Sequence, residues 1–199
     1  MARTATAVQV RPAPAPPRRR VSRPSAPPVR LWTAEELLAL PDDGHRYELV
    51  RGRLITMTPA SARHGKLAAR LVGALLPFVE AHDLGEVYTA EPGFTLESDP
   101  DTVRAPDVAF VRRERIPPEG EPEGFWAIAP DLVIEIVSPS ESAHTVQAKV
   151  ADYLRAGTRL LWVVYPDSRT VMEFRAPDQA RLLTAEDHLE GGEVVPGFS

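Results

Sequence analysis

The segment Leu132–Val137 constrains the fold of this 199-residue chain more strongly than any other feature. It reads Leu-Val-Ile-Glu-Ile-Val, an almost unbroken apolar run of strand-forming residues. Such a run is typical of a β-strand that is covered on both faces. Glu135 lies in the middle of it, where an ionised carboxylate is unfavourable unless a partner compensates its charge. The sequence therefore predicts a layered domain with a paired acid inside it.

Three segments carry helix signals. A capping-box pattern at Thr33–Glu36 precedes a short apolar run. The second segment repeats apolar residues at three- and four-residue steps, which predicts a core helix with a kink at Pro77. Ser140 or Ser142 can cap the third helix, and Gly157 occupies the usual stop position. The predicted helices cover approximately residues 33–40 and 61–82, and a third that starts at residue 140 or 142 and ends at 156.

The remaining apolar runs predict strands. Arg51-Gly52 separates two β-prone runs, as the turn of a hairpin does. We expect the strands between residues 86 and 137 to be neighbours in one sheet. The order strand, helix, strand that follows implies a crossover connection, so the expected fold class is α/β, a mixed β-sheet flanked by helices. The predicted strands lie at residues 47–50, 53–57, 86–90, 94–96, 107–111, 132–137, 160–165 and 170–174.

The charge of the chain is divided between two regions. Residues 1–30 are rich in proline and carry seven arginines and no acid, which predicts a disordered Pro/Arg-rich arm. Residues 31–199 form the predicted folded domain, with 16 basic against 28 acidic residues and a net charge of −12. The arm could hold nucleic-acid phosphate or be a solvated extension with no specific role. An acidic domain counts against a nucleic-acid substrate unless basic residues cluster locally.

The chain has no cysteine, which excludes disulfides, thiolate metal sites and thiol nucleophiles. A metal ion would have to bind carboxylate, carbonyl or imidazole groups, which suit hard divalent ions. No run of about 18 apolar residues is present, and the basic N-terminus lacks the apolar stretch of a secretory signal. We therefore expect a cytoplasmic protein that does not associate with membranes.

Two acids stand in apolar surroundings. Asp107 follows Ala105-Pro106 at the start of a predicted strand, and Glu135 lies in the next one. If the two strands are adjacent, both carboxylates can bind one Mg²⁺ or Mn²⁺ ion, which would explain why they stay ionised. A purely structural role stays open for each acid. Asp107 can simply end a turn after Pro106, and Glu135 can form a buried salt bridge.

Two motifs carry a resemblance to a known family. Residues 104–111 read RAPDVAFV, and residues 130–140 read PDLVIEIVSPS. Both resemble the putative restriction endonucleases of the Uma-two type, which belong to the PD-(D/E)XK nuclease superfamily. The resemblance includes Tyr47–Gly52 and covers roughly residues 32–198.

The resemblance implies a metal-dependent endonuclease that hydrolyses phosphodiester bonds in DNA. It implies that Asp107 and Glu135 bind the metal ion and that Glu48 is a further acid of the catalytic site. It is also compatible with a homodimer. The bound ion would polarise a phosphoryl oxygen and generate the attacking hydroxide from water. The alternative is a catalytically degenerate module that keeps the fold and binds DNA or a protein partner. An RNA substrate also stays open.

One position departs from the superfamily pattern. The lysine that usually follows two residues after the second acid is replaced by Val137. The resemblance suggests that Lys149, on the following helix, completes the catalytic set in its place. A lysine side chain is long enough to orient the attacking water and to stabilise charge on the phosphate from there. Lys149 could instead face solvent, as most lysines do.

Further polar and aromatic residues permit more than one interpretation. Glu48 could pair across the hairpin with Arg51 or Arg53 rather than serve a catalytic site. His64 could contact phosphate at a helix N-terminus or be an ordinary surface histidine. Three aromatic residues are interpreted as core or rim side chains rather than as base-stacking platforms: Trp126, Tyr153 and Trp162.

Overall fold

The computed structural model describes residues 30–199. The arm predicted for residues 1–30 therefore lies, apart from Arg30, outside the described residues. The helices are α1 (Ala34–Leu38), α2 (Ala62–Ala81) and α3 (Ala143–Ala156), with a 3-10 turn η1 at Arg113–Arg115. The strands are β1 (Arg46–Val50), β2 (Arg53–Met57), β3 (Gly85–Thr89), β4 (Phe94–Glu97), β5 (Thr102–Arg104), β6 (Val108–Arg112), β7 (Leu132–Ile136), β8 (Leu160–Tyr165), β9 (Thr170–Ala176) and β10 (Gln179–Leu183).

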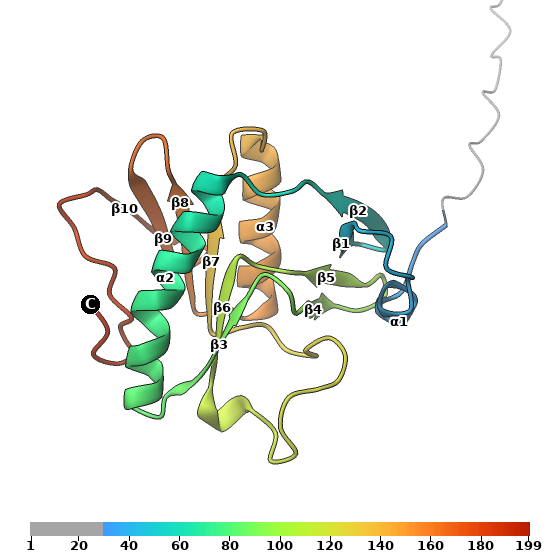
Figure 1. Cartoon of the computed structure of the whole chain (residues 1–199), viewed down its shortest axis with the longest axis horizontal. Coiled ribbons are helices and arrows are strands. Elements are labelled where there is room, and N and C mark those ends of the chain that lie inside the picture. The colour runs from blue at the N-terminus through green and yellow to red at the C-terminus, as the bar shows by residue number, and fades with distance from the viewer. Residues whose placement is uncertain (1–29) are drawn as a thin grey trace, which may run out of the picture.

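Within residues 30–199 the strands form two sheets (Figure 1). The larger sheet has six strands in the order β10-β9-β8-β7-β6-β3, and the smaller sheet has four in the order β2-β1-β5-β4. In the larger sheet β7 and β8 are parallel, and the other neighbours are antiparallel. The parallel pair is joined by α3 as a crossover. The predicted α/β class, with a partly parallel mixed sheet and flanking helices, is therefore confirmed.

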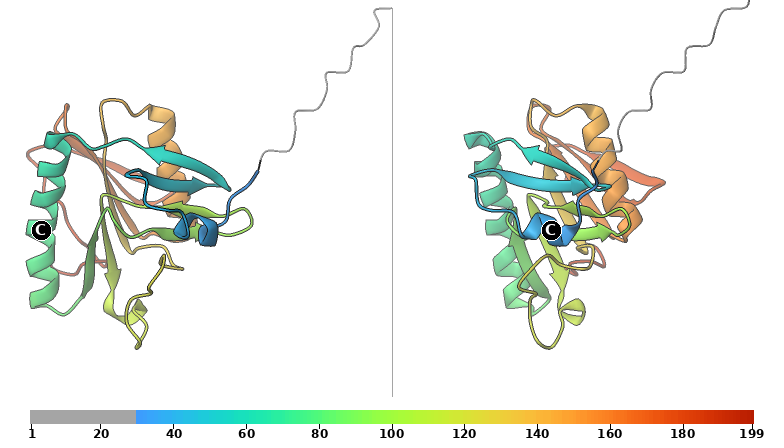
Figure 2. Two further views of the ribbon diagram at one scale, coloured as in Figure 1. Left: turned by 45° about the vertical axis from the view of Figure 1, so that its right-hand side comes forward. Right: turned by 90° about the vertical axis from the view of Figure 1, so that its right-hand side faces the viewer.

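The larger sheet is covered on both faces, as its apolar strands predict (Figure 2). On one face, Leu75 and Val79 of α2 pack against apolar residues of β6, β7 and β8. On the other face, Val146 and Tyr153 of α3 pack against β7 and β8. The smaller sheet lies on the same side as α3. Because alternate strand residues point to opposite faces, Glu135 shares the α3 side with the smaller sheet.

Local signals predicted the helix ends correctly. Thr33 Oγ1 accepts a hydrogen bond from the Glu36 amide while the Glu36 carboxylate accepts one from the Thr33 amide, so the capping box forms. Ser142, rather than Ser140, caps α3, since its hydroxyl accepts a bond from the Thr145 amide. No helix in the described part of the chain has both the length and the apolar character needed to cross a bilayer.

The expectation that residues 86–90 and 94–96 belong to one sheet is wrong. β3 pairs with β6 in the larger sheet, whereas β4 pairs with β5 in the smaller one. The chain changes sheets between them at Gly93, where any side chain would overlap Phe125. Two strands, β5 and β10, have no counterpart in the prediction. β5 is only three residues long and ends in Arg104, and most of β10 is exposed, so neither carries a clear apolar pattern.

Gly157 offers a test of how α3 ends. Its φ of +103° lies in the left-handed region, and a Cβ there would meet no atom within 4 Å. Only the backbone conformation therefore opposes a side chain, and we expect Gly157→Ala to lower the free energy of unfolding by about 1 kcal/mol in urea denaturation. The control is Gly73→Ala inside α2, where a Cβ also meets nothing within 4 Å. There the same change should raise stability by about 0.5–1 kcal/mol, and equal effects at both positions would refute the argument.

Candidate active site

Asp107 directly precedes β6, next to the strand β7 that carries Glu135. β6 and β7 are antiparallel, with Val108 opposite Ile134. The Ile136 amide donates a hydrogen bond of 2.7 Å to Asp107 Oδ2. The Asp107 side chain is 17% exposed and that of Glu135 is 8% exposed. The two strands are thus neighbours, which is required if both carboxylates are to bind one metal ion.

His64 reaches Asp107 from the first turn of α2. Ser61 caps this helix by accepting a hydrogen bond of 3.3 Å from the His64 amide. His64 Nε2 lies 3.1 Å from Asp107 Oδ2, and the histidine side chain is only 13% exposed. The hydrogen bond to Asp107 raises the pKa of His64, although burial acts in the opposite direction. His64 is therefore not an ordinary surface histidine but a direct neighbour of the acidic pair.

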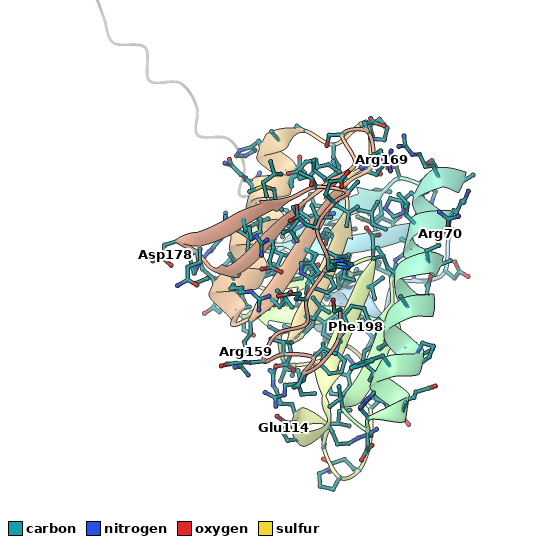
Figure 3. The ribbon with its side chains drawn as sticks, turned by 90° about the vertical axis from the view of Figure 1, so that its left-hand side faces the viewer. Arg70, Glu114, Arg159, Arg169, Asp178 and Phe198 are labelled. Carbon is teal, nitrogen blue, oxygen red and sulfur yellow. The ribbon has the colours of Figure 1, made fainter. Side chains whose placement is uncertain are left out.

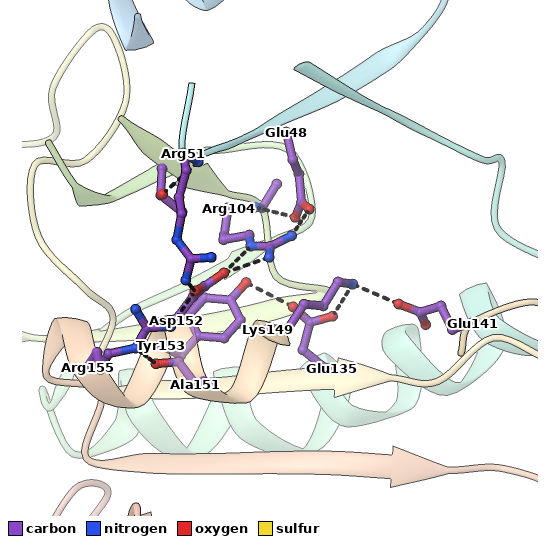
Figure 4. Close-up of polar contacts among 12 residues, drawn as sticks. Glu48, Arg51, Arg104, Glu135, Glu141, Lys149, Ala151, Asp152, Tyr153 and Arg155 are labelled. Carbon is purple, nitrogen blue, oxygen red and sulfur yellow. Dashed lines mark hydrogen bonds and ion pairs between the residues drawn. The ribbon is translucent and has the colours of Figure 1, made fainter. Parts of the chain in front are cut away.

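Both carboxylate oxygens of Glu135 accept hydrogen bonds from α3 (Figure 4). Lys149 Nζ donates to Oε2 at 2.9 Å, and the Tyr153 hydroxyl donates to Oε1 at 2.8 Å. Burial raises the pKa of Glu135 to about 7. Lys149 opposes this rise, whereas the nearby carboxylates of Asp107 and Glu48 add to it. The protonated form of Glu135 is thus favoured mainly by its burial, with a smaller contribution from the neighbouring carboxylates.

Lys149 is buried, which is uncommon for a lysine. Its side chain is 10% exposed, and its Nζ also lies 3.1 Å from Glu141 Oε1. Burial alone would lower the pKa of Lys149, but the carboxylates of Glu135 and Glu48 raise it above its usual range. The ammonium thus stays charged and faces the acids. Lys149 therefore does not face solvent, which was the alternative that the sequence left open.

Glu48 is held at the site by a buried arginine (Figure 4). Arg104 Nη1 lies 2.7 Å from Glu48 Oε2, and its Nη2 lies 2.6 Å from Asp152 Oδ2. The exposed fractions are 4% for Arg104, 1% for Glu48 and 7% for Asp152. The Ala105 amide donates to the other oxygen of Glu48 at 3.1 Å. Arg51, a partner considered for Glu48, lies 3.8 Å from Asp152 instead.

The donor set of the acidic pair fits a divalent cation, although the described residues contain no group of three or more Asp, Glu or His side chains spaced to hold a metal ion. Mg²⁺ commonly takes one or two carboxylates and completes its shell with water and phosphate oxygens. Each carboxylate oxygen has two lone-pair positions, so Asp107 and Glu135 can still accept ligands beside their present hydrogen bonds. A cation beside Glu135 would also favour its ionised form against the effect of burial.

Two contributors to this arrangement are not predicted from the sequence. Tyr153 is interpreted there as a core aromatic, and it is fully buried, but its hydroxyl also binds Glu135. Its position four residues after Lys149 places both side chains on one face of α3, and this spacing could have indicated the role. Arg104 lies in the motif at 104–111, but nothing in the sequence shows that it turns inward.

Comparison with known proteins places this geometry in context. A family model named Uma2, described as "putative restriction endonuclease", matches residues 34–199. The structure is similar to the crystal structure at 1.96 Å resolution of a putative nuclease belonging to DUF820 from Anabaena variabilis ATCC 29413. The two chains are 25% identical with a TM-score of 0.71, and the match covers 82% of this chain and 90% of that one. No curated protein matches.

Proposed function

Because the chain belongs to the Uma2 family of putative restriction endonucleases, we propose that it is a metal-dependent endonuclease that hydrolyses phosphodiester bonds in DNA. A nuclease function agrees with both the family and the similar structure. The observation that carries the proposal is that Asp107, at the start of β6, is hydrogen-bonded to the β7 residue that follows Glu135, beside a buried ammonium. Acidic ligands and a fixed cation are what hydrolysis of a phosphodiester requires from a protein.

The acidic pair provides the ligands in this proposal. Asp107 and Glu135 would hold Mg²⁺ or Mn²⁺, which would polarise a phosphoryl oxygen and lower the pKa of a water molecule. The Ile136 amide fixes the carboxylate of Asp107, and the Tyr153 hydroxyl fixes that of Glu135. Glu48 adds negative charge to the same site.

Lys149 supplies the ammonium that the strand lacks at Val137. Its Nζ lies 2.9 Å from Glu135, so a phosphate beside this carboxylate would be within reach of the same ammonium. The positive charge orients the attacking water and stabilises the charge that develops on the phosphate oxygens. Water releases a proton to solvent as it attacks phosphorus, the P–O bond to one sugar breaks, and the departing sugar oxygen takes a proton from solvent.

A plasmid assay tests the proposal. The full chain is incubated with supercoiled DNA in Mg²⁺, in Mn²⁺ and in EDTA, alongside an Asp107→Asn variant. Asparagine keeps an oxygen that can accept the Ile136 hydrogen bond but lacks the charge that binds the cation. We expect nicked or linear DNA only from the wild-type protein with a divalent ion. Cleavage that persists in EDTA or in Asp107→Asn would refute metal-dependent catalysis at this site.

The proposed role of Lys149 gives a separate prediction. We expect Lys149→Met to slow cleavage by about 10²-fold, the usual cost of removing one preorganised donor from developing charge. Binding of Mn²⁺ should not weaken, because the ammonium no longer competes for Glu135. Single-turnover cleavage and calorimetry measure the two effects. Arg155→Met, an exposed cation on the same helix, is the control and should cleave at the wild-type rate. A wild-type rate in Lys149→Met would remove this lysine from the mechanism.

A second candidate function has one specific observation in its favour. The hydrogen bonds from Lys149 and Tyr153 already engage both oxygens of Glu135, as in a structural ion pair. A module that keeps the fold and binds DNA or a protein without catalysis would show this arrangement as well. Such a module would bind no divalent ion at Asp107, so measured metal binding separates the two functions. The homodimer allowed by the family resemblance stays a prediction.

A further inference from the structure

A basic depression of about 370 Å³ lies between α2 and the turn that joins β8 to β9. Four cationic side chains line it: Arg63, Lys66, Arg70 and Arg169. No aspartate or glutamate among the described residues lines the same depression. Figure 3 shows Arg70 and Arg169 on this side of the molecule, with Arg159 well away from them.

This concentration of positive charge contrasts with the rest of the domain. Residues 31–199 carry 16 basic and 28 acidic residues, so one depression gathers a quarter of the basic side chains. The sequence of α2 contains no acid before Glu80. Its basic residues at 63, 66 and 70 follow the three- and four-residue steps that align side chains on one helix face. The local cluster that an acidic nucleic-acid-binding domain needs is thus present.

Most of this charge is available to an external anion. Arg63 pairs with Asp167 at 2.6 Å. Lys66, Arg70 and Arg169 are exposed and form no ion pair with other described residues. An exposed cation without an acidic partner can exchange its water for phosphate oxygens at little cost, which is the basis of backbone binding to DNA. These three side chains are called the basic strip below.

The depression continues toward the candidate active site. A smaller hollow is lined by His64, Ser138 and neighbouring residues, and it shares Arg63 and Pro166 with the basic depression. His64 in turn lies 3.1 Å from Asp107. Asp167, the partner of Arg63, also lines this hollow. The basic strip and the acidic pair are thus linked at the surface through Arg63 and His64.

We infer that the basic strip binds the phosphate backbone of DNA on one side of the bond that is cut. This inference rests on the proposed function for the identity of the polyanion. The contacts are to phosphate, so they hold the substrate in position without selecting its sequence. The acidic net charge of the domain counts against a DNA substrate unless basic residues cluster locally, and the basic strip is such a cluster.

Salt-dependent binding tests the inference independently of cleavage. A fluorescein-labelled DNA duplex is titrated with the full chain in EDTA at several salt concentrations, and anisotropy gives Kd. The strip variant combines Lys66→Gln, Arg70→Gln and Arg169→Asn, because asparagine tolerates the φ of +57° at residue 169. Each lost phosphate contact should reduce the slope of log Kd against log salt by about 0.9, which gives a total loss of about two to three.

A matched variant controls for net charge. Arg53→Gln, Arg159→Gln and Arg181→Gln remove three exposed arginines that do not line the depression. Circular dichroism melts confirm that both variants fold. We expect a reduced slope in the strip variant and a near wild-type slope in the control. Equal slopes in the two variants would overturn the inference. The binding titration contains EDTA, so it does not depend on cleavage. If the strip variant shows the reduced slope but the wild-type protein cleaves no DNA in a separate assay with Mg²⁺, only the proposed function is rejected.

Discussion

Replacement of Glu135 by glutamine is expected to slow Mg²⁺-dependent DNA cleavage by about 10³-fold. The substitution removes one of two charged ligands proposed for the ion, whose stabilisation of transition-state charge is worth several kcal/mol. Glutamine can preserve the local hydrogen bonds, since its oxygen can accept from Lys149 and its nitrogen can donate to the Tyr153 hydroxyl. The measurement is the single-turnover rate on plasmid DNA. A variant that retains a tenth or more of the wild-type rate would contradict a ligand role.

The stability of the same variant provides its control. The pKa of Glu135 is raised from 4.5 to about 7 by burial, so the folded protein binds a proton more tightly than the unfolded chain does. Without metal, this group therefore lowers stability as pH rises from about 4.5 through 7. Glu135→Gln removes that loss, so the variant should be at least as stable as the wild type at pH 8. Lost activity in a stable variant then reports on chemistry rather than on unfolding.

Removal of the buried Arg104 guanidinium is expected to have the largest effect on stability. In Arg104→Gln, the carboxylates of Glu48 and Asp152 remain buried without their shared cation, and we expect the free energy of unfolding to fall by about 3–5 kcal/mol. Urea denaturation measures this change. The matched control is Arg51→Gln, because Arg51 lies 3.8 Å from the same Asp152 but is 57% exposed. An exposed pair of this kind contributes about 0–1 kcal/mol.

A combined variant separates the lost cation from lost packing. Glu48→Gln, Arg104→Met and Asp152→Asn together leave no uncompensated charge in the cluster. We expect this protein to be more stable than Arg104→Gln alone, because the cost of the single change is mostly that of two unpaired acids. If the combined variant is less stable than the single one, the shape of the cluster matters more than its charge balance.

The parts of the fold that follow from local chemistry could be predicted from the sequence. The capping box at Thr33 and the left-handed stop at Gly157 depend on neighbouring residues, and both form as expected. The strand around Glu135 is apolar enough to show that both of its faces are covered. The division into two sheets could not be predicted. It depends on which partner each strand finds, and the short strands β3 and β4 belong to different sheets although they follow each other along the chain.

The candidate site, too, could be predicted from the sequence only in part. The apolar surroundings of Asp107 and Glu135 indicated two acids that need compensation, and the adjacent antiparallel strands bring them together. Other contacts at the site come from distant elements. His64 reaches Asp107 from α2, and Arg104 reaches Glu48 from the end of a three-residue strand. Such long-range contacts leave no periodic pattern, so only the folded chain reveals them.

Titration of Mn²⁺ into the full chain, followed by calorimetry without DNA, tests most directly whether Asp107 and Glu135 form a metal site. We expect binding of about one ion per chain, with the two carboxylates as its ligands. The binding heat should disappear in Asp107→Asn and in Glu135→Gln, and it should persist in Arg155→Met. No binding at millimolar Mn²⁺, or equal binding in the wild type and both acid variants, would contradict the proposed metal site.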